Sequence, residues 1–242
     1  MDRCCRWLLV AVLSLFGTMA SAVDLKHVRI AGESWPEHTN ADGSGLAWDI
    51  LRRVFEPAGI RLDIESVPYT RSVGLVRRGE ADAWVGSYLN EVDDRVFYPR
   101  WHYDTDEIVA LGLKDTTPPT VETLGQFRLA WVRGYGYQRY LPSVRYYQEV
   151  MRRGGILRML DLKHADFYLD ALGEVSDVLE TSTDRSRYRV TPLTKLPLYL
   201  GFADNARGRA LAKVFDQRMD TLVPSGSLRP IFQHWQQPYP FD

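Results

Sequence analysis

The chain has 242 residues, of which 45% are hydrophobic, and a formal net charge of −1. This length is enough for one large domain or for two lobes of ordinary size. The near-neutral charge argues against nucleic acid as a partner, because nucleic-acid-binding proteins need a clustered basic face.

The N-terminus has the pattern of a cleaved secretory signal. Arg3 and Arg6 form a positive region, residues 7–16 form a short apolar core, and residues 20–22 (Ala-Ser-Ala) supply the small side chains of a cleavage site. The apolar core is shorter than the roughly 20 residues that a membrane-spanning helix needs. We therefore predict a signal peptide at residues 1–22 and a periplasmic mature protein.

The only two cysteines, Cys4 and Cys5, lie inside this predicted leader. The mature chain is therefore expected to contain no disulfide, no thiol nucleophile and no cysteine metal site. Neither cysteine follows a small residue at the end of the apolar core, which favours a soluble product over a lipid-anchored one.

Strands and helices alternate in the first part of the chain. Apolar positions recur at helical spacing between Leu46 and Phe55, and they nearly alternate with charged residues between Ile60 and Val67. The predicted elements are a strand at 28–31, a helix at 46–55, a strand at 60–67, a helix at 70–78 and a strand at 81–85. This order predicts a parallel sheet with right-handed crossovers.

The same alternation restarts after a break at residues 116–119 (Thr-Thr-Pro-Pro). The elements predicted next are a strand at 127–132, a helix at 156–162, a strand at 165–169, strand-like segments at 188–190 and 198–202, and helices at 206–222 and 227–235. Glu107–Leu113 and Leu198–Phe202 flank the second unit, so both are predicted to cross between lobes. We predict a discontinuous first lobe (23–109 and 199–242), a second lobe (110–198) and a hinge of two strands.

Several short motifs in this order resemble the family 3 bacterial extracellular solute-binding proteins, periplasmic receptors best known for polar amino acids. They are Gly45 and Asp49, residues 67–71 (Val-Pro-Tyr-Thr-Arg), residues 79–83 (Gly-Glu-Ala-Asp-Ala), Arg95, Leu124 with Gly125, Gly134, Leu160–Asp166 and Leu222–Trp235. The resemblance implies an α/β, periplasmic binding protein-like fold of two lobes. It also implies a monomer that closes on a small polar ligand, such as an amino acid, supplies an inner-membrane ABC permease and catalyses no reaction.

Two opposite charges are candidates for holding the ends of such a ligand. A guanidinium at Arg95 can grip a carboxylate through paired hydrogen bonds, or it can form a surface ion pair with Asp93 or Asp94. The resemblance implies that Asp166 receives the ligand's ammonium group; its structural alternatives are a backbone cap or an ion pair with Lys163.

The remaining candidates follow the predicted strands, because two-lobed α/β proteins bind ligands outside the carboxyl ends of their strands. Their side chains offer aromatic walls, hydroxyl groups and one further guanidinium. These candidate ligand-binding residues are Trp35, Tyr69, Arg71, Ser87, Tyr88, Tyr135 and Tyr137.

No motif indicates a cofactor or a metal. The sequence lacks a complete dinucleotide fingerprint, a phosphate-binding loop and a nucleophile elbow, and its five histidines are scattered. Two alternative functions stay open. One is an enzyme on the same scaffold, resembling cyclohexadienyl dehydratases, with Glu33 or Glu91 as the acid; the other is a ligand sensor that acts in trans.

Overall fold

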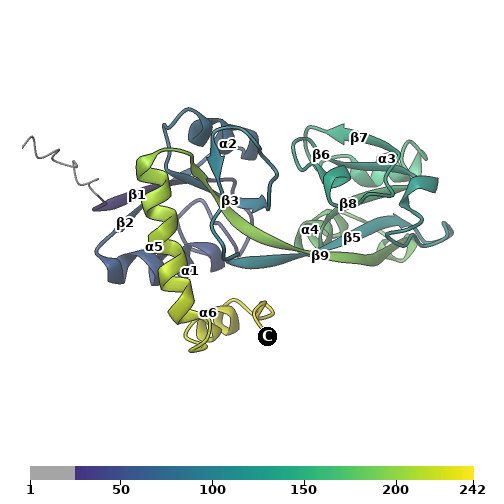
Figure 1. The fold of residues 1–242 in the computed structure, drawn as a ribbon. Helices are drawn as coiled ribbons and strands as arrows, with labels where there is room; N and C mark the ends of the chain where they lie inside the picture. Colours follow the sequence, from purple (N-terminus) through teal and green to yellow (C-terminus); the bar gives the residue numbers. More distant parts are fainter. Residues whose placement is uncertain (1–24) are drawn as a thin grey trace, which may run out of the picture.

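The computed structural model describes residues 25–242 and shows two α/β lobes joined by two long strands (Figure 1). The first lobe contains β1 (His27–Gly32), α1 (Leu46–Phe55), β2 (Arg61–Ser66), α2 (Tyr69–Arg77), β3 (Ala83–Tyr88), β4 (Val96–Phe97), α5 (Ala206–Leu222) and α6 (Arg229–His234). The second contains β6 (Arg128–Val132), β7 (Tyr146–Val150), α3 (Ile156–Asp161), β8 (Phe167–Ala171) and α4 (Leu172–Glu180). The joining strands are β5 (Asp104–Leu113) and β9 (Tyr188–Ala203). The predicted leader and its cysteines lie outside the described residues.

The nine strands found between residues 25 and 242 belong to one sheet, in the order β2-β1-β3-β9-β5-β8-β6-β7, with β4 paired to β9. The pairs β1–β2, β1–β3, β6–β7 and β6–β8 are parallel, whereas β9 runs antiparallel to β3 and β5. The predicted class, two α/β lobes with a hinge of two strands, is thus confirmed. The lobe boundaries at 109/110 and 198/199 stay a prediction.

The long strand β9 connects the lobes through two successive partners. Its residues from Tyr188 to Leu198 pair with β5, and those from Leu198 to Phe202 pair with β3. Pro192 and Pro197 lie in the stretch that pairs with β5 on one side only. Such edge stretches tolerate proline, which has no N–H group to donate. This explains why two separate strand-like segments in the sequence form one continuous strand.

Helix α1 shows why the predicted elements form where they do. Its apolar positions, among them Leu46, Ile50 and Val54, are completely buried against the sheet. The helix ends in a short turn containing Pro57 and then Gly59, whose φ of +76° is the left-handed conformation that glycine adopts readily. The predicted bounds of α1 and α5 agree with the structure.

Two elements of the second lobe were not predicted. Helix α4 has only two buried apolar positions, Val175 and Val178, and β7 is an edge strand whose first four residues are exposed. Neither segment therefore shows a strong hydrophobic period. Strand β8 was predicted two residues too early, and this shift changes which aspartate lies at its carboxyl end.

A cluster of buried side chains extends from the first lobe into the second. It includes Trp84 of β3 and Trp131 of β6, and tyrosines from both lobes lie between them. Because apolar contacts continue across the gap between the lobes, the structure represents a closed arrangement.

Candidate functional site

Loops that follow the parallel strands of the two lobes meet each other. Tyr69 follows β2, and its ring centroid lies 5.8 Å from that of Tyr135, which follows β6. Tyr88, the last residue of β3, has its ring centroid 6.0 Å from that of Tyr137. These two aromatic pairs define a site between the lobes, at the strand ends where α/β proteins bind ligands.

A buried carboxylate, Glu91, supports the first-lobe side of this site. The Tyr69 hydroxyl donates to its two oxygens at 2.7 and 2.6 Å, while the Ser87 hydroxyl and the Tyr88 N–H each donate to Oε2 at 3.1 Å. Burial raises the pKa of Glu91 to about 7, against the opposing effect of the Tyr69 hydrogen bond. Glu91 therefore titrates near neutral pH and holds two of the site's tyrosines in place.

Trp35 covers the same side from the loop after β1. Its ring centroid lies 6.0 Å from that of Tyr69. It also packs on Gly86, which has a φ of +86°, and a Cβ atom at this position would lie 2.4 Å from the indole ring. Only glycine lets the β3 backbone approach Trp35 this closely.

The second-lobe side carries a polar cluster around Arg153. Its Nε atom lies 2.9 Å from Asp170 and 3.0 Å from Glu174, and Nη2 donates to the Tyr135 hydroxyl at 2.7 Å. Asp170 is only 1% exposed and also accepts a hydrogen bond from the Tyr168 hydroxyl. Four segments of the lobe thus bring their polar groups to one point.

The two carboxylates of this cluster share one guanidinium. Burial raises the pKa of Glu174 to about 8, although the charge of Arg153 acts in the opposite direction. Burial raises the pKa of Asp170 as well, again opposed by Arg153. The single positive charge of Arg153 therefore does not hold the pKa values of Asp170 and Glu174 at the ordinary values of these acids.

Two further carboxylates approach the cluster from the hinge and from the first lobe. Asp106 of β5 accepts a hydrogen bond of 2.8 Å from the Tyr88 hydroxyl, and burial raises its pKa to about 7. Burial also raises the pKa of Glu33, which follows β1. The charge of Arg153 lowers the pKa values of Glu33 and Asp106, and the charge of Asp170 raises them. Both carboxylates therefore interact electrostatically with Arg153 and Asp170.

Direct hydrogen bonds hold the lobes together at the rim of this site. Arg139 of the second lobe donates from Nη1 to the backbone carbonyl of Glu91 at 2.9 Å, and the Tyr140 hydroxyl donates to the carbonyl of Leu89 at 3.2 Å. Both acceptors are backbone groups of the loop after β3. The closed arrangement is thus stabilised by polar contacts as well as by aromatic packing.

The fold resembles solved structures of binding proteins and sensor domains. One is a histidine kinase sensor domain described as similar to periplasmic binding proteins (TM-score 0.69, 14% identity, 87% of this chain and 95% of that one). A second is an ABC uptake transporter substrate-binding protein from Streptococcus pneumoniae with bound histidine (0.64, 17%, 87% and 92%). A third is the GluR0 ligand-binding core in complex with L-glutamate (0.68, 15%, 86% and 97%).

The chain has a periplasmic binding protein fold. No family model and no curated protein sequence matches it, so the likeness concerns the three-dimensional structure. None of the helices between residues 25 and 242 combines the length and the apolarity needed to cross a bilayer.

The periplasmic binding protein fold places six of the nine predicted ligand-binding residues at the interlobe site. These six are Trp35, Tyr69, Ser87, Tyr88, Tyr135 and Tyr137. Arg71 lies in the first turn of α2, but its side chain is exposed and forms no ion pair with any residue from 25 to 242.

Arg95 and Asp166 are not brought together. Arg95 precedes β4 and is 72% exposed beside Asp94. Asp166 precedes β8 and forms an ion pair of 2.6 Å with Arg128. The carbonyl of Arg95 accepts a hydrogen bond from the N–H of Asp204, which follows β9 beside the start of β3. The N–H of Asp166 donates to the carbonyl of Arg128, the first residue of β6. Both residues thus lie at the amino ends of the parallel strands, the edge opposite to the interlobe site.

Glu33 and Glu91 were named from the sequence as candidate acids, whereas Asp106, Arg153, Asp170 and Glu174, which the structure also places at this site, were not predicted. Asp170 lies near the carboxyl end of β8, and the same strand-end criterion selects it once β8 is extended to Ala171. Arg153 precedes Gly154 and Gly155 in an irregular loop, where no hydrophobic period marks its position. Only the folded chain brings Arg153 to Asp170.

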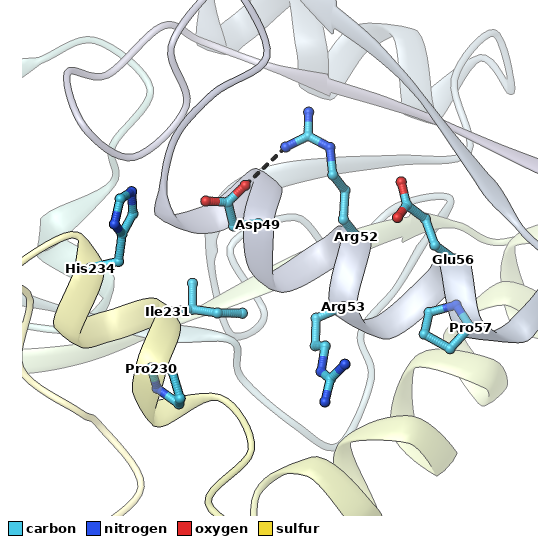
Figure 2. Close-up of a pocket in the computed structure, with 8 residues that line it drawn as sticks. All are labelled: Asp49, Arg52, Arg53, Glu56, Pro57, Pro230, Ile231 and His234. Atoms are coloured by element: carbon cyan, nitrogen blue, oxygen red, sulfur yellow. Dashed lines mark hydrogen bonds and ion pairs between the residues drawn. The ribbon is translucent and has the colours of Figure 1, made fainter.

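A surface pocket of about 430 Å³ lies elsewhere, between α1 and α6 of the first lobe (Figure 2). Its lining combines charged side chains of both signs with proline and isoleucine: Asp49, Arg52, Arg53, Glu56, Pro57, Pro230, Ile231 and His234. A smaller pocket of about 180 Å³ lies beside Asp166. Neither pocket includes a residue of the interlobe site, so we base the candidate site on the contacts between the lobes.

Within residues 25–242, no group of three or more histidine, cysteine, aspartate or glutamate side chains is arranged to hold a metal ion. The carboxylates at the interlobe site are instead engaged by Arg153 and by tyrosine hydroxyls. The chemistry that this arrangement offers is hydrogen bonding, charge pairing and stacking.

Proposed function

We propose that this chain is a periplasmic solute-binding protein that captures a small polar organic molecule, an amino acid or a related compound, between its lobes. The observation that carries this proposal is the meeting of Tyr69, Tyr88, Tyr135 and Tyr137 from opposite lobes beside the Arg153 cluster. Aromatic walls with a few convergent polar groups are typical of small-molecule sites.

Lobe closure gives this site its affinity. A ligand that contacts both lobes favours the closed state by its difference in affinity for the two states, and charge pairs inside strengthen as water leaves. The bonds from Arg139 and Tyr140 to the first lobe then help to hold the closed state. The two strands β5 and β9 are the hinge on which such a movement depends.

Export and delivery complete the proposal. The predicted signal peptide takes the chain to the periplasm, where it acts as a monomer and presents its ligand to an inner-membrane ABC permease. The solved binding proteins that share the fold include one from an ABC uptake transporter with bound histidine, which supports amino acids as the first compounds to test.

The test is a binding screen on protein purified from the periplasm. Thermal unfolding and calorimetry are measured with amino acids, small organic acids and amines, each at a saturating concentration. A true ligand at 100 times its Kd stabilises the protein by about 2.7 kcal/mol, which corresponds to a rise in Tm of about 5 °C or more. Absence of any shift and any heat across the whole panel contradicts the proposal.

A pair of tyrosine variants locates the binding. Tyr135→Ala removes a buried ring from the interlobe site, whereas Tyr146→Ala removes a 66% exposed ring from the same lobe. We expect Tyr135→Ala to weaken binding at least tenfold and Tyr146→Ala to leave it unchanged.

An enzyme on the same fold is the second candidate, and the raised pKa values of Glu33 and Glu91 favour it. A carboxylic acid that is protonated near neutral pH can donate its proton to a departing hydroxyl group, as water and carbon dioxide leave a prephenate-like substrate. Incubation with prephenate, followed by a spectroscopic search for phenylpyruvate, decides between the two: product that forms in proportion to enzyme favours catalysis.

A sensor that acts in trans is the third candidate, because a histidine kinase sensor domain shares the fold at a TM-score of 0.69. Gene deletion distinguishes an importer's binding protein from a sensor. Deletion of an importer's binding protein abolishes uptake of the labelled ligand, whereas deletion of a sensor changes gene expression and leaves uptake intact.

A further inference from the structure

The interlobe site contains more negative than positive groups. Asp170 interacts electrostatically with Glu33, Asp106 and Glu174, which come from the first lobe, the hinge and the second lobe. Arg153 is the one basic side chain among residues 25–242 that forms an ion pair with any of them. When all four carboxylates are ionised, this leaves a surplus of three negative charges.

Arg153 is already engaged by its own lobe. Its Nε atom serves Asp170 and Glu174, and Nη2 serves the Tyr135 hydroxyl. These bonds orient the guanidinium towards its own carboxylates and neutralise it. The site therefore offers little positive charge to a ligand carboxylate, although it offers ample negative charge to a ligand cation.

Aromatic rings lie beside the same carboxylates. Tyr69 and Tyr135 form an edge-to-face contact across the lobe boundary, Tyr135 forms another with Tyr137 of its own lobe, and Trp35 packs on Tyr69. Ring faces attract ammonium and guanidinium groups, and this attraction increases when water is excluded. Charge and aromatic surface thus favour the same kind of ligand.

We propose that the ligand of the interlobe site carries a net positive charge: an organic ammonium or guanidinium compound whose cationic group lies among Glu33, Asp106 and Glu174. This inference rests on the proposed function and names the substrate class of that site. In the absence of a cation, closure places unmatched carboxylates in a space with little water, which is unfavourable unless they take up protons.

The proposal predicts a link between binding and protons. The titratable and charged groups that face the cluster are Glu33 after β1, Tyr69 of α2, Tyr88 of β3, Glu91 after β3, Tyr103 before β5, Asp104 and Asp106 of β5, Tyr135 and Tyr137 after β6, Arg153 before α3, Tyr168 and Asp170 of β8, and Glu174 and Asp177 of α4. Burial raises the pKa of Asp106 to about 7 and that of Glu174 to about 8. A bound cation lowers these pKa values, so binding releases protons and affinity rises as the pH increases through this range.

The test uses titration calorimetry on the full periplasmic protein at pH 6 and pH 8. The probes are agmatine, arginine, glutamine and glutamate, which vary the charge at similar size, and putrescine as a smaller diamine. Each titration is repeated in two buffers with different ionisation enthalpies, so that proton release is measured directly. Arginine and agmatine separate a cationic amino acid from a cation without a carboxylate.

Matched variants test the assignment of the carboxylates. Glu174→Gln and Glu33→Gln each remove one negative charge from the cluster. Their controls are Glu180→Gln on the same helix and Glu37→Gln in the same loop, both of which remove an exposed charge. We expect each cluster variant to weaken cation binding at least tenfold at pH 8, to reduce proton release, and its control to do neither.

The outcomes separate this inference from the function on which it rests. Binding of arginine, agmatine or putrescine, tighter at pH 8 and accompanied by proton release, supports it. Binding of glutamine or glutamate at the Tyr135-dependent site, with no cation binding there, overturns the charge inference and keeps the solute-binding function. Absence of binding by every probe, together with no response in the wider screen, overturns both.

Discussion

The guanidinium of Arg139 donates a hydrogen bond of 2.9 Å to the backbone carbonyl of Glu91, so a residue of the second lobe is bonded to the first. The same Nη1 atom lies 3.4 Å from the carboxylate of Asp93. Because these contacts exist only when the lobes are together, Arg139 stabilises the closed state selectively.

Replacing Arg139 is therefore expected to open the protein. Loss of a partly exposed hydrogen bond worth about 1 kcal/mol lowers the ratio of closed to open molecules about fivefold in Arg139→Ala. Arg133→Ala is the control, because Arg133 is an exposed residue of the same loop whose side chain contacts Met151 of its own lobe. The ratio is read from distances between spin labels at Arg61→Cys and Thr183→Cys, two exposed positions on opposite lobes. Equal ratios in the Arg139 and Arg133 variants would show that the bond does not govern closure.

Arg153 is expected to be essential for stability as well as for binding. Arg153→Ala leaves Asp170 buried without its cation, and breaking a buried pair in this way costs about 3 kcal/mol or more. Arg152→Ala, which removes the exposed neighbouring guanidinium, is expected to cost less than about 0.5 kcal/mol. Urea denaturation measures both values.

A second substitution identifies the cause of this loss. If the unpaired carboxylate is responsible, Asp170→Asn in the Arg153→Ala background recovers part of the lost stability. A double variant that is less stable than Arg153→Ala contradicts this account.

Glu91 is expected to make stability depend on pH. Its pKa is about 7 in the folded protein and near its ordinary value of 4.5 in the unfolded chain, so the folded state binds the proton more tightly. The contribution of Glu91 to the free energy of unfolding therefore decreases as the pH rises from about 4.5 to 7, by up to about 1.4 kcal/mol per pH unit. Chemical denaturation at several pH values should give a flatter profile for Glu91→Gln, and an unchanged profile for the exposed control Glu65→Gln. Parallel profiles for wild type and Glu91→Gln count against the raised pKa.

The two charges that the sequence favoured are expected to be unimportant for ligand affinity. Arg95→Ala removes a 72% exposed guanidinium, and Asp166→Asn removes the partner of Arg128 at the amino end of β8. We expect affinity within twofold of wild type in both, whereas Asp170→Asn weakens binding at least tenfold. A tenfold loss in Arg95→Ala would restore that residue as a ligand contact.

The sequence predicts the fold well where the hydrophobic period is strong. Helices α1 and α5 and strand β1 have buried apolar residues at regular spacing, and β2 has half-buried ones at alternate positions. Each of these elements lies within a residue or two of its predicted bounds. Strand β9 was predicted in two pieces because Pro192 and Pro197 interrupt its pattern, and only its pairing with β5 explains why the chain stays extended there.

The aromatic residues of the site were predictable from the sequence, but its Arg153 cluster was not. The tyrosines at the end of β3 and after β2 and β6 lie where the strand-end criterion places them, because parallel strands bring their carboxyl ends to one edge. Arg153 and Asp170 are 17 residues apart, and their 2.9 Å contact depends on how the loop before α3 folds over β8. Nothing in a single sequence encodes that contact in a readable pattern.

The central claim, that a ligand draws the two lobes together, is tested most directly by the distance between the Arg61→Cys and Thr183→Cys labels. It is measured by pulsed electron paramagnetic resonance with and without the tightest-binding compound of the screen. We expect a broad distribution without ligand, and with ligand a narrow one at the separation found in this closed structure. The same distribution in both samples, at a ligand concentration that saturates the protein by calorimetry, contradicts the account.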